Sequence, residues 1–340
     1  MKKLLIISLV VLIPIMLMGE IFPKTGTAAL QFLKLGIDAR ATGMGEAYVA
    51  VTDDISSVYW NPAGLATKLE QQSFFSHTKW VADISHEYAA VSFTDGIQAF
   101  AISASVLHMD DMDVVDEATF GPNGKTFTAS DIALGLTYAN AFTDKFSFGL
   151  TAKYLRENLH DYSVDSYAVD IGSLYNTQWN NLTIGMALRN FGPDVIYEID
   201  NDDDGSTDED PFDLLDNDGD GLIDEDDEEL GFKIPMNYSL GVAVDLMRDD
   251  VQSMIFSGQL DNTIDREETW NVGTEYNYKN MSLRGGYQIG YDETSYSFGA
   301  GFVVPTRLAT FNIDYSYTDM GDLTEDFVNG VHRFSVKLRY

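Results

Sequence analysis

The chain has 340 residues and a formal net charge of −33, from 54 acidic and 21 basic side chains. Such acidity leaves no basic surface for phosphates, so we expect no binding to nucleic acid. The absence of cysteine excludes a disulfide framework, a thiol nucleophile, a thiolate zinc site and a lipid-modified cysteine anchor.

The N-terminus predicts export from the cytoplasm. Lys2 and Lys3 precede an apolar run over residues 4–18, which Pro14 interrupts and Gly19 follows. A charged start, an apolar run of this length and a small residue at its end are typical of a secretory signal peptide. We therefore predict a signal peptide at residues 1–19. The alternative is a membrane-anchoring helix, for which the run is short.

Residues 20–67 predict a compact segment of short helices and turns. The segment is rich in Gly and Ala, Asp53 and Asp54 suit the start of a helix, and Asn61-Pro62 is a turn signal. It is long enough to plug the lumen of a wide β-barrel, which side chains alone cannot fill. We predict that residues 20–67 form a helical hatch.

The remaining residues, 68–340, predict β-strands. In residues 146–154, 311–317 and 334–340 apolar side chains alternate with small or polar ones, which indicates strands with two unlike faces. The residues expected to face inward include Ser147, Thr151, Lys153, Ser335, Lys337 and Arg339. About fourteen segments of about 9–13 residues alternate in this way, the length of a tilted membrane-spanning strand. They begin near Gln72, Glu87, Gln98, Phe127, Lys145, Ser163, Leu182, Asn237, Val251, Thr269, Met281, Ser295, Leu308 and Val331.

The connections between these segments favour a membrane barrel over a soluble β-sandwich. Every second connection is short, whereas the long ones, at residues 108–126, 192–236, 261–268 and 319–330, all fall on the other side. Aromatic residues (18 Tyr and 20 Phe) cluster toward strand ends, as in the girdles of outer-membrane barrels. We predict an all-β fold, an antiparallel transmembrane β-barrel of about fourteen strands, in the bacterial outer membrane. Glycines within the strands, such as Gly149, Gly185, Gly241, Gly273, Gly299 and Gly301, suit barrel curvature.

An acidic insert at residues 196–230 predicts a calcium site. Residues 198–229 contain 18 of the acidic residues and no Lys or Arg, and two similar loops begin at Asp200 and Asp216. Calcium-binding loops supply oxygen ligands from positions 1, 3, 5, 7, 9 and 12, with Gly at position 6. The second loop fills these positions with Asp216, Asp218, Asp220, Leu222 (a backbone carbonyl), Asp224 and Asp227. The first supplies Asp200, Asp202, Asp204 and Asp208 but has Pro211 at position 12.

We expect calcium to order this insert, which the predicted topology places on the cell exterior, because closely packed carboxylates repel one another unless a cation neutralises them. The alternatives are a disordered acidic tract and a charged loop that binds divalent ions weakly.

Residues 36–66, GIDARATGMGEAYVAVTDDISSVYWNPAGLA, resemble the opening of the PorV/PorQ group, which is related to FadL-type outer-membrane transporters. The resemblance implies that Asn61, Pro62, Ala63 and Gly64 belong to an N-terminal hatch motif. Tyr340, at the end of the last strand, resembles the signal read by the outer-membrane assembly machinery. The acidic insert departs from the group and resembles a thrombospondin type 3 repeat.

The resemblance implies two alternative functions. PorV-like proteins bind exported proteins in type IX secretion and pass them to other components of the secretion system. FadL-like proteins are hatch-gated channels for hydrophobic molecules, and the hatch motif is common to both groups. The predicted inward residues are mostly polar, which disfavours an apolar passage. We expect no enzyme, because His77, His86, His108, His160 and His332 show no pattern of a catalytic set.

Overall fold

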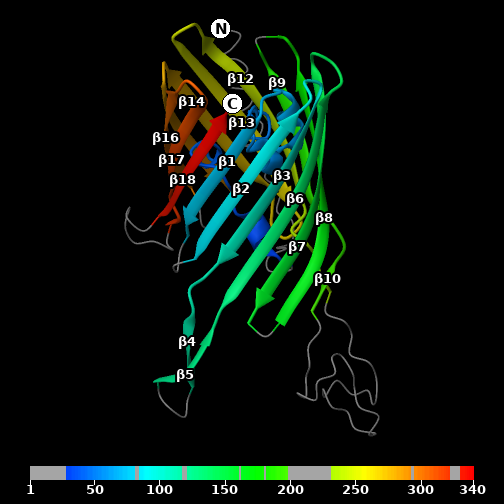
Figure 1. The fold of residues 1–340 in the computed structure, drawn as a ribbon, viewed down its shortest axis with the longest axis vertical. Coiled ribbons are helices and arrows are strands. Elements are labelled where there is room, and N and C mark those ends of the chain that lie inside the picture. Colours follow the sequence, from blue (N-terminus) through cyan, green and yellow to red (C-terminus); the bar gives the residue numbers. More distant parts are fainter. Residues whose placement is uncertain are drawn as a thin grey trace.

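The computed structural model describes residues 28–80, 84–116, 121–160, 162–179, 181–197, 231–291, 295–321 and 330–340. Fourteen long strands form one closed antiparallel barrel, in which the last strand pairs with the first (Figure 1). The prediction of an antiparallel barrel of about fourteen strands is confirmed. The strands are β1 (Gln72–Lys79), β2 (Ser85–Thr94), β3 (Gln98–His108), β6 (Ala129–Ala141), β7 (Phe146–Leu159), β8 (Tyr162–Asn176), β9 (Thr183–Phe191), β12 (Asn237–Arg248), β13 (Gln252–Thr263), β14 (Thr269–Tyr278), β15 (Met281–Ile289), β16 (Tyr296–Pro305), β17 (Thr310–Thr318) and β18 (Val331–Arg339).

Each of these strands begins within two residues of its predicted start. The structure differs from the prediction in two respects. Strands β7 and β8 are longer than expected, at 14 and 15 residues. The connection predicted at residues 108–126 contains a hairpin of β4 (Met112–Asp116) and β5 (Gly121–Phe127). Val114 and Val115 favour extended backbone, and pairing with β5 stabilises it.

The two faces of the barrel wall differ in polarity, as the period-two pattern predicts. Outward side chains are apolar, and Leu136 on β6 is 64% exposed. The neighbouring Thr137 points inward and donates or accepts a hydrogen bond with Thr151 of β7 at 2.8 Å. Ser147, Thr151, Ser335 and Lys337, which were predicted to face inward, are buried. None of the helices in the described residues is long and apolar enough to cross a membrane.

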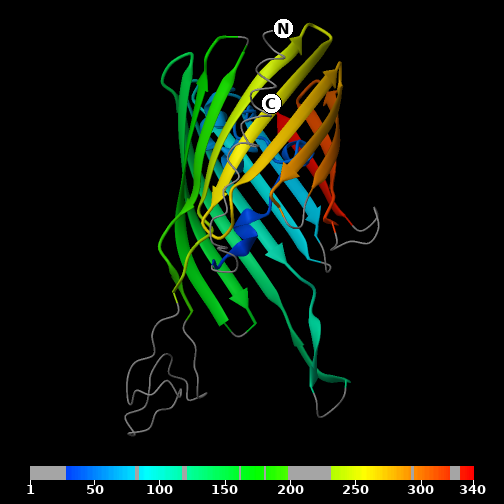
Figure 2. The same cartoon turned by 180° about the vertical axis from the view of Figure 1, so that it is seen from behind.

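The short and long connections lie at opposite ends of the barrel. The C-terminus and the short turns lie at the upper end in Figure 1, whereas β4, β5 and β10 (Val195–Ile196) lie at or beyond the lower end (Figures 1 and 2). We call these the short-turn end and the long-loop end. Strand β10 pairs with β11 (Gly231–Phe232), so the two flanks of the acidic insert meet at the long-loop end.

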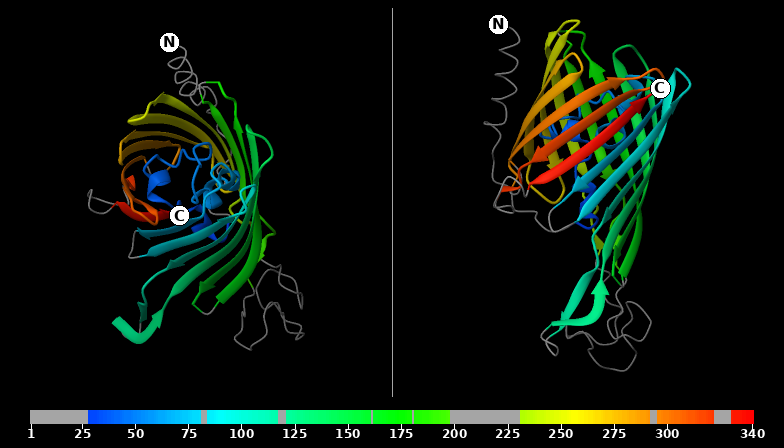
Figure 3. Two further views of the ribbon diagram at one scale, coloured as in Figure 1. Left: turned by 45° about the horizontal axis from the view of Figure 1, so that its top comes forward. Right: turned by 60° about the vertical axis from the view of Figure 1, so that its left-hand side comes forward.

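Within the described residues, four short helices lie inside the barrel (Figure 3). They are η2 (Gln31–Lys34), α2 (Ala39–Thr42), α3 (Ser57–Trp60) and η3 (Pro62–Ala66). This hatch runs along the lumen: Ala28 pairs with Lys233 near the long-loop end, whereas residues 50–53 line a cavity with the short turn at residues 141–145. The predicted signal peptide at residues 1–19 lies outside the described residues.

Several glycines of the wall lie where the hatch backbone touches it. A Cβ atom on Gly149 would come within 3.0 Å of Pro62, and one on Gly185 would come equally close to Val49. On β15, a Cβ on Gly286 would meet the backbone of Met44 and Gly45. These contacts give the three glycines a role besides curvature, because a larger residue would push the hatch away from the wall.

Replacing Gly286 with Ala should therefore destabilise the barrel, by about 1–3 kcal/mol as for other overpacked sites. The adjacent Gly285 provides the control, since a Cβ there has nothing within 4 Å. Denaturant unfolding of the detergent-solubilised protein, followed by tryptophan fluorescence, measures both variants. Equal stability of Gly286→Ala and Gly285→Ala would contradict a close contact between hatch and wall.

Candidate functional site

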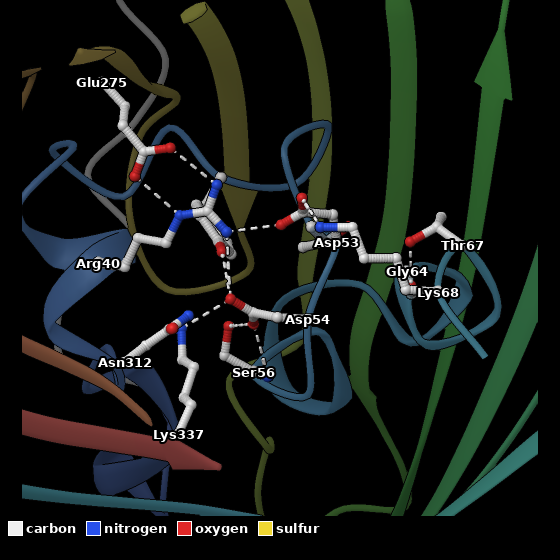
Figure 4. A network of polar contacts seen from close by, with 12 residues as sticks. Arg40, Asp53, Asp54, Ser56, Gly64, Thr67, Lys68, Glu275, Asn312 and Lys337 are labelled. Atoms are coloured by element: carbon white, nitrogen blue, oxygen red, sulfur yellow. Dashed lines mark hydrogen bonds and ion pairs between the residues drawn. The ribbon is translucent and has the colours of Figure 1, made fainter. Parts of the chain in front are cut away.

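The main polar site of the barrel is a network of buried charges between the hatch and the wall (Figure 4). Arg40 of α2 is at its centre. Its Nε and Nη2 atoms donate hydrogen bonds of 2.9 Å to the two carboxylate oxygens of Glu275 on β14. Its Nη1 atom donates to Asp53 at 2.5 Å and to Asp54 at 3.1 Å. A guanidinium group suits this role because its planar fork matches a carboxylate.

Lys337 provides a second link, from the last strand of the barrel. Its ammonium group lies 2.6 Å from Asp38 and 2.8 Å from Asp54, and its side chain is only 1% exposed. Ser335, two residues earlier on the same face of β18, donates to Asp38 at 3.0 Å. The strand pattern predicted Lys337 as inward-facing, but not that two hatch carboxylates would be its partners.

The network continues along the inner wall of the barrel. Arg284 of β15 lies 2.6 Å from Glu275 of the neighbouring β14 and 2.7 Å from Asp314 of β17, so it links strands on both sides, reaching across β16. Buried carboxylates are tolerated only when they are paired in this way. Each of the three hatch carboxylates described above therefore has a basic partner, either on the wall or on the hatch itself.

The pKa shifts of the hatch carboxylates reflect this pairing. Burial alone would raise the pKa of Asp54, but Lys337 and Arg40 outweigh it and hold the pKa well below its usual range. For Asp38 burial dominates over the attraction of Lys337, and its pKa is raised. Because Asp54 stays charged, the Lys337 ammonium remains neutralised within the lumen.

The hatch motif, residues 61–64, also has a structural role. The Asn61 side chain caps η3 by accepting a hydrogen bond from Ala63 N at 3.2 Å. Its Nδ2 atom donates to Val49 O at 2.9 Å and to Ser173 O of β8 at 3.1 Å. Pro62 starts the helix, where a missing N–H costs nothing. Asn61 thus joins two parts of the hatch to the wall.

Gly64 is constrained by its neighbours in the hatch, because a Cβ there would come within 3.0 Å of the side chains of Thr52 and Ser57. Ala63 is fully buried. The structure thus brings Asn61, Pro62, Ala63 and Gly64 together in a packed turn inside the barrel.

The predicted calcium ligands, from Asp200 to Asp227, lie outside the described residues. Within the described ranges, no group of three His, Asp or Glu side chains is arranged to hold a metal ion. His77 and His108 both contact Glu87, and His86 contacts Ser105 at 2.7 Å. Among the described side chains, no carboxylate contacts His86, so a serine-hydrolase triad is not assembled there.

Removing the Lys337 charge should release the hatch. The Lys337→Met change leaves Asp38 and Asp54 buried without their shared cation, which typically costs about 3–5 kcal/mol. The control is Lys125→Met, since Lys125 is exposed on the β5 hairpin. Denaturant unfolding measures both variants, and an unchanged midpoint for Lys337→Met would show that the ion pairs do not hold the hatch.

Comparison with known proteins identifies the family to which the chain belongs. A family model described as type IX secretion system protein PorV matches residues 22–244. No curated protein matches the chain in sequence. A Pseudomonas aeruginosa FadL homologue is similar in structure, with 14% identity and a TM-score of 0.54 over 90% of this chain and 98% of that one.

Two other solved structures are similar at the same level. The Ralstonia pickettii toluene transporter TbuX has 13% identity and a TM-score of 0.54, over 90% of this chain and 97% of that one. The Pseudomonas putida toluene transporter TodX has 10% identity and a TM-score of 0.50, over 87% and 96%. At such low identity these likenesses establish the fold alone. Because the family model covers most of the sequence, the chain belongs to the PorV family of type IX secretion system proteins and is an outer-membrane β-barrel.

Proposed function

We propose that this protein binds exported proteins of the type IX pathway at its long-loop end and passes them to other secretion components. The observation that carries the proposal is the fixed hatch, which joins the inner wall through Arg40 and Lys337. Because the hatch occupies the lumen, the barrel is better suited to holding a partner protein than to conducting a solute. Membership of the PorV family supports the same function.

The long-loop end offers the surface for such a partner. The β4–β5 hairpin extends beyond the barrel there, with Met112 and Val115 exposed (Figure 1). The connections that carry β10 and β11 lie at the same end. In the proposed orientation this end faces the cell exterior, where exported proteins emerge.

A hatch-gated channel for hydrophobic molecules is the second candidate. A cluster of buried apolar side chains near the long-loop end favours it, including Phe32 and Leu33 of the hatch, Leu155 of β7 and Ile234. The fold is also that of the toluene transporters TbuX and TodX. Against it, the lumen wall is rich in buried Ser, Thr, Asn and charged residues, and an apolar solute would lose free energy beside them.

Purification from native outer membrane in mild detergent, followed by mass spectrometry, distinguishes the two functions. We expect exported proteins that share one C-terminal domain to copurify in stoichiometric amounts. Copurification should decrease when residues 112–127, the β4–β5 hairpin, are replaced by a short Gly-Ser turn. A barrel that arrives alone with fatty acids or other apolar molecules would instead favour the channel.

We also propose that the acidic insert binds calcium. The support is the spacing of Asp216, Asp218, Asp220, Asp224 and Asp227 in the sequence, which matches an oxygen-ligand loop. The pairing of Val195 with Phe232 keeps the ends of the insert together, which reduces the entropy that calcium binding must overcome.

Calcium should protect residues 195–232 from proteases, because ligand binding draws the loop into one compact conformation. Limited proteolysis with and without a chelator, read by mass spectrometry, measures this. The double variant Asp218→Asn and Asp220→Asn should be cleaved as if calcium were absent, while cleavage elsewhere in the chain should not change. Identical cleavage of the native insert in both conditions would rule the site out.

A further inference from the structure

The β4–β5 hairpin has two outer edges without a partner strand. It forms a two-stranded sheet of its own, and within the described residues no other strand pairs with β4 or β5. The hairpin extends from the barrel at the long-loop end (Figures 1 and 3). A hairpin of two strands is only marginally stable in water, whereas a sheet of three strands with apolar contacts is stable. An extended polypeptide that adds to one of these edges would therefore stabilise the sheet.

The barrel holds the base of the hairpin in place. The pairing of β3 with β6 reaches His108 at the long-loop end of these strands. Met109 N then donates a hydrogen bond to Ala129 O at 3.4 Å, and the pairing resumes at Met112 of β4. The hairpin thus continues two strands of the barrel wall. Its edges have a defined direction before any partner binds, which lowers the entropic cost of binding.

The two edges differ in the features that prevent pairing. Natural sheets protect an exposed edge with proline, lysine or a β-bulge. Strand β5 has all three: Pro122, Lys125 and a bulge at residues 123–125, where Gly124 has a φ of 82°. Strand β4, with the sequence MDVVD, contains neither proline nor lysine. The open edge of β4 is therefore the one that is left unprotected.

The side chains of β4 define the kind of strand that fits beside it. Met112 and Val115 are 50% and 66% exposed, and their odd spacing places them on opposite faces of the strand. Asp110, Asp111 and Asp113 are exposed next to them, and β4 has no basic residue. A strand that carries both apolar side chains and Lys or Arg complements this edge, because cross-strand pairs of opposite charge are stabilising.

Charge also distinguishes between the candidate occupants. The whole chain has a net charge of −33, and residues 198–229 contain 18 acidic residues and no Lys or Arg. A second copy of the chain, or the acidic insert, would bring further negative charge toward the aspartates beside β4, which is unfavourable. An exported polypeptide with basic side chains is attracted instead. In the proposed orientation such a polypeptide emerges on the side of the membrane to which the hairpin extends.

We infer that β4 accepts an extended segment of an exported protein as the third strand of the β4–β5 sheet. Main-chain hydrogen bonds from the open edge of β4 provide affinity, while Met112, Asp113 and Val115 select a segment with apolar and basic side chains. The inference rests on the proposed function. It adds the mode of recognition, which is pairing through the main chain, and the chemistry of the recognised segment.

Proline substitutions on β4 test the main-chain pairing. Successive N–H groups of a strand point to opposite edges, so one of Asp113→Pro and Val114→Pro removes a donor from the open edge and the other removes one from the side of β5. The matched controls are Asp113→Ala and Val114→Ala, which keep the N–H group. Isothermal titration of the detergent-solubilised barrel with a purified exported protein of the type IX pathway measures all four variants.

We expect each proline variant to bind at least about tenfold more weakly than its alanine counterpart, because the ring removes a hydrogen bond and obstructs the close approach of a strand. Unfolding midpoints of the barrel should be equal in all four variants, since the hairpin lies beyond the closed barrel. This comparison separates a lost binding edge from a misfolded protein.

Hydrogen exchange, read by mass spectrometry, provides a measurement that side-chain contacts alone would not change. Binding of the exported protein should slow exchange of the β4 amides by at least about tenfold, because a hydrogen-bonded amide exchanges only when its pairing opens. Amides of the turn at residues 94–97, at the short-turn end, provide the control and should exchange at the same rate with and without the partner.

The outcomes separate the inference from the proposed function. Equal binding by the proline and alanine variants, or unchanged exchange of the β4 amides in the complex, would overturn the inference and leave the proposed function intact. A dimer of the barrel that the proline substitutions dissociate would also overturn it, because a second copy would then occupy the edge. If the native barrel does not bind the exported protein at all, the proposed function fails, and the inference fails with it.

Discussion

The position of the hatch depends on the Lys337 ammonium group, which lies between Asp38 and Asp54. Lys337 belongs to the last strand and both carboxylates belong to the hatch, so this contact links the hatch to the strand that closes the barrel. Arg40 extends the link to Glu275 on β14, on a different part of the wall. Since a buried charge without its partner is strongly unfavourable, these contacts hold one hatch position.

The inner surface of the wall is complementary to the hatch in that position. Inward glycines allow backbone contacts with Val49, Pro62 and Gly45, and polar side chains satisfy hydrogen bonds of the hatch backbone, as Gln259 does for Tyr48 N and Val49 N. Hatch and barrel therefore form one packed body. The free surfaces are the two ends, and at the long-loop end the apolar cluster that includes Phe32 and Ile234 lies close to the connections.

Much of this fold could be predicted from the sequence because each strand has a local, period-two pattern. The starts of all fourteen strands and the inward position of Lys337 follow from that pattern. The pairing of Arg40 with Glu275 could not be predicted, since 235 residues separate them and only barrel closure brings them together. The contacts of Gly149 and Gly185 with the hatch could not be predicted for the same reason, because the hatch is distant from them in sequence.

The central claim is that the barrel works with its hatch fixed, and a reversible crosslink tests it most directly. Thr42 of the hatch and Ser316 of β17 place their hydroxyl oxygens 2.8 Å apart, and the chain has no cysteine of its own. The double variant Thr42→Cys and Ser316→Cys should form a disulfide that locks the hatch to the wall. We predict that cells with the locked barrel still secrete type IX proteins. Secretion that stops when the disulfide forms and resumes on reduction would contradict the account.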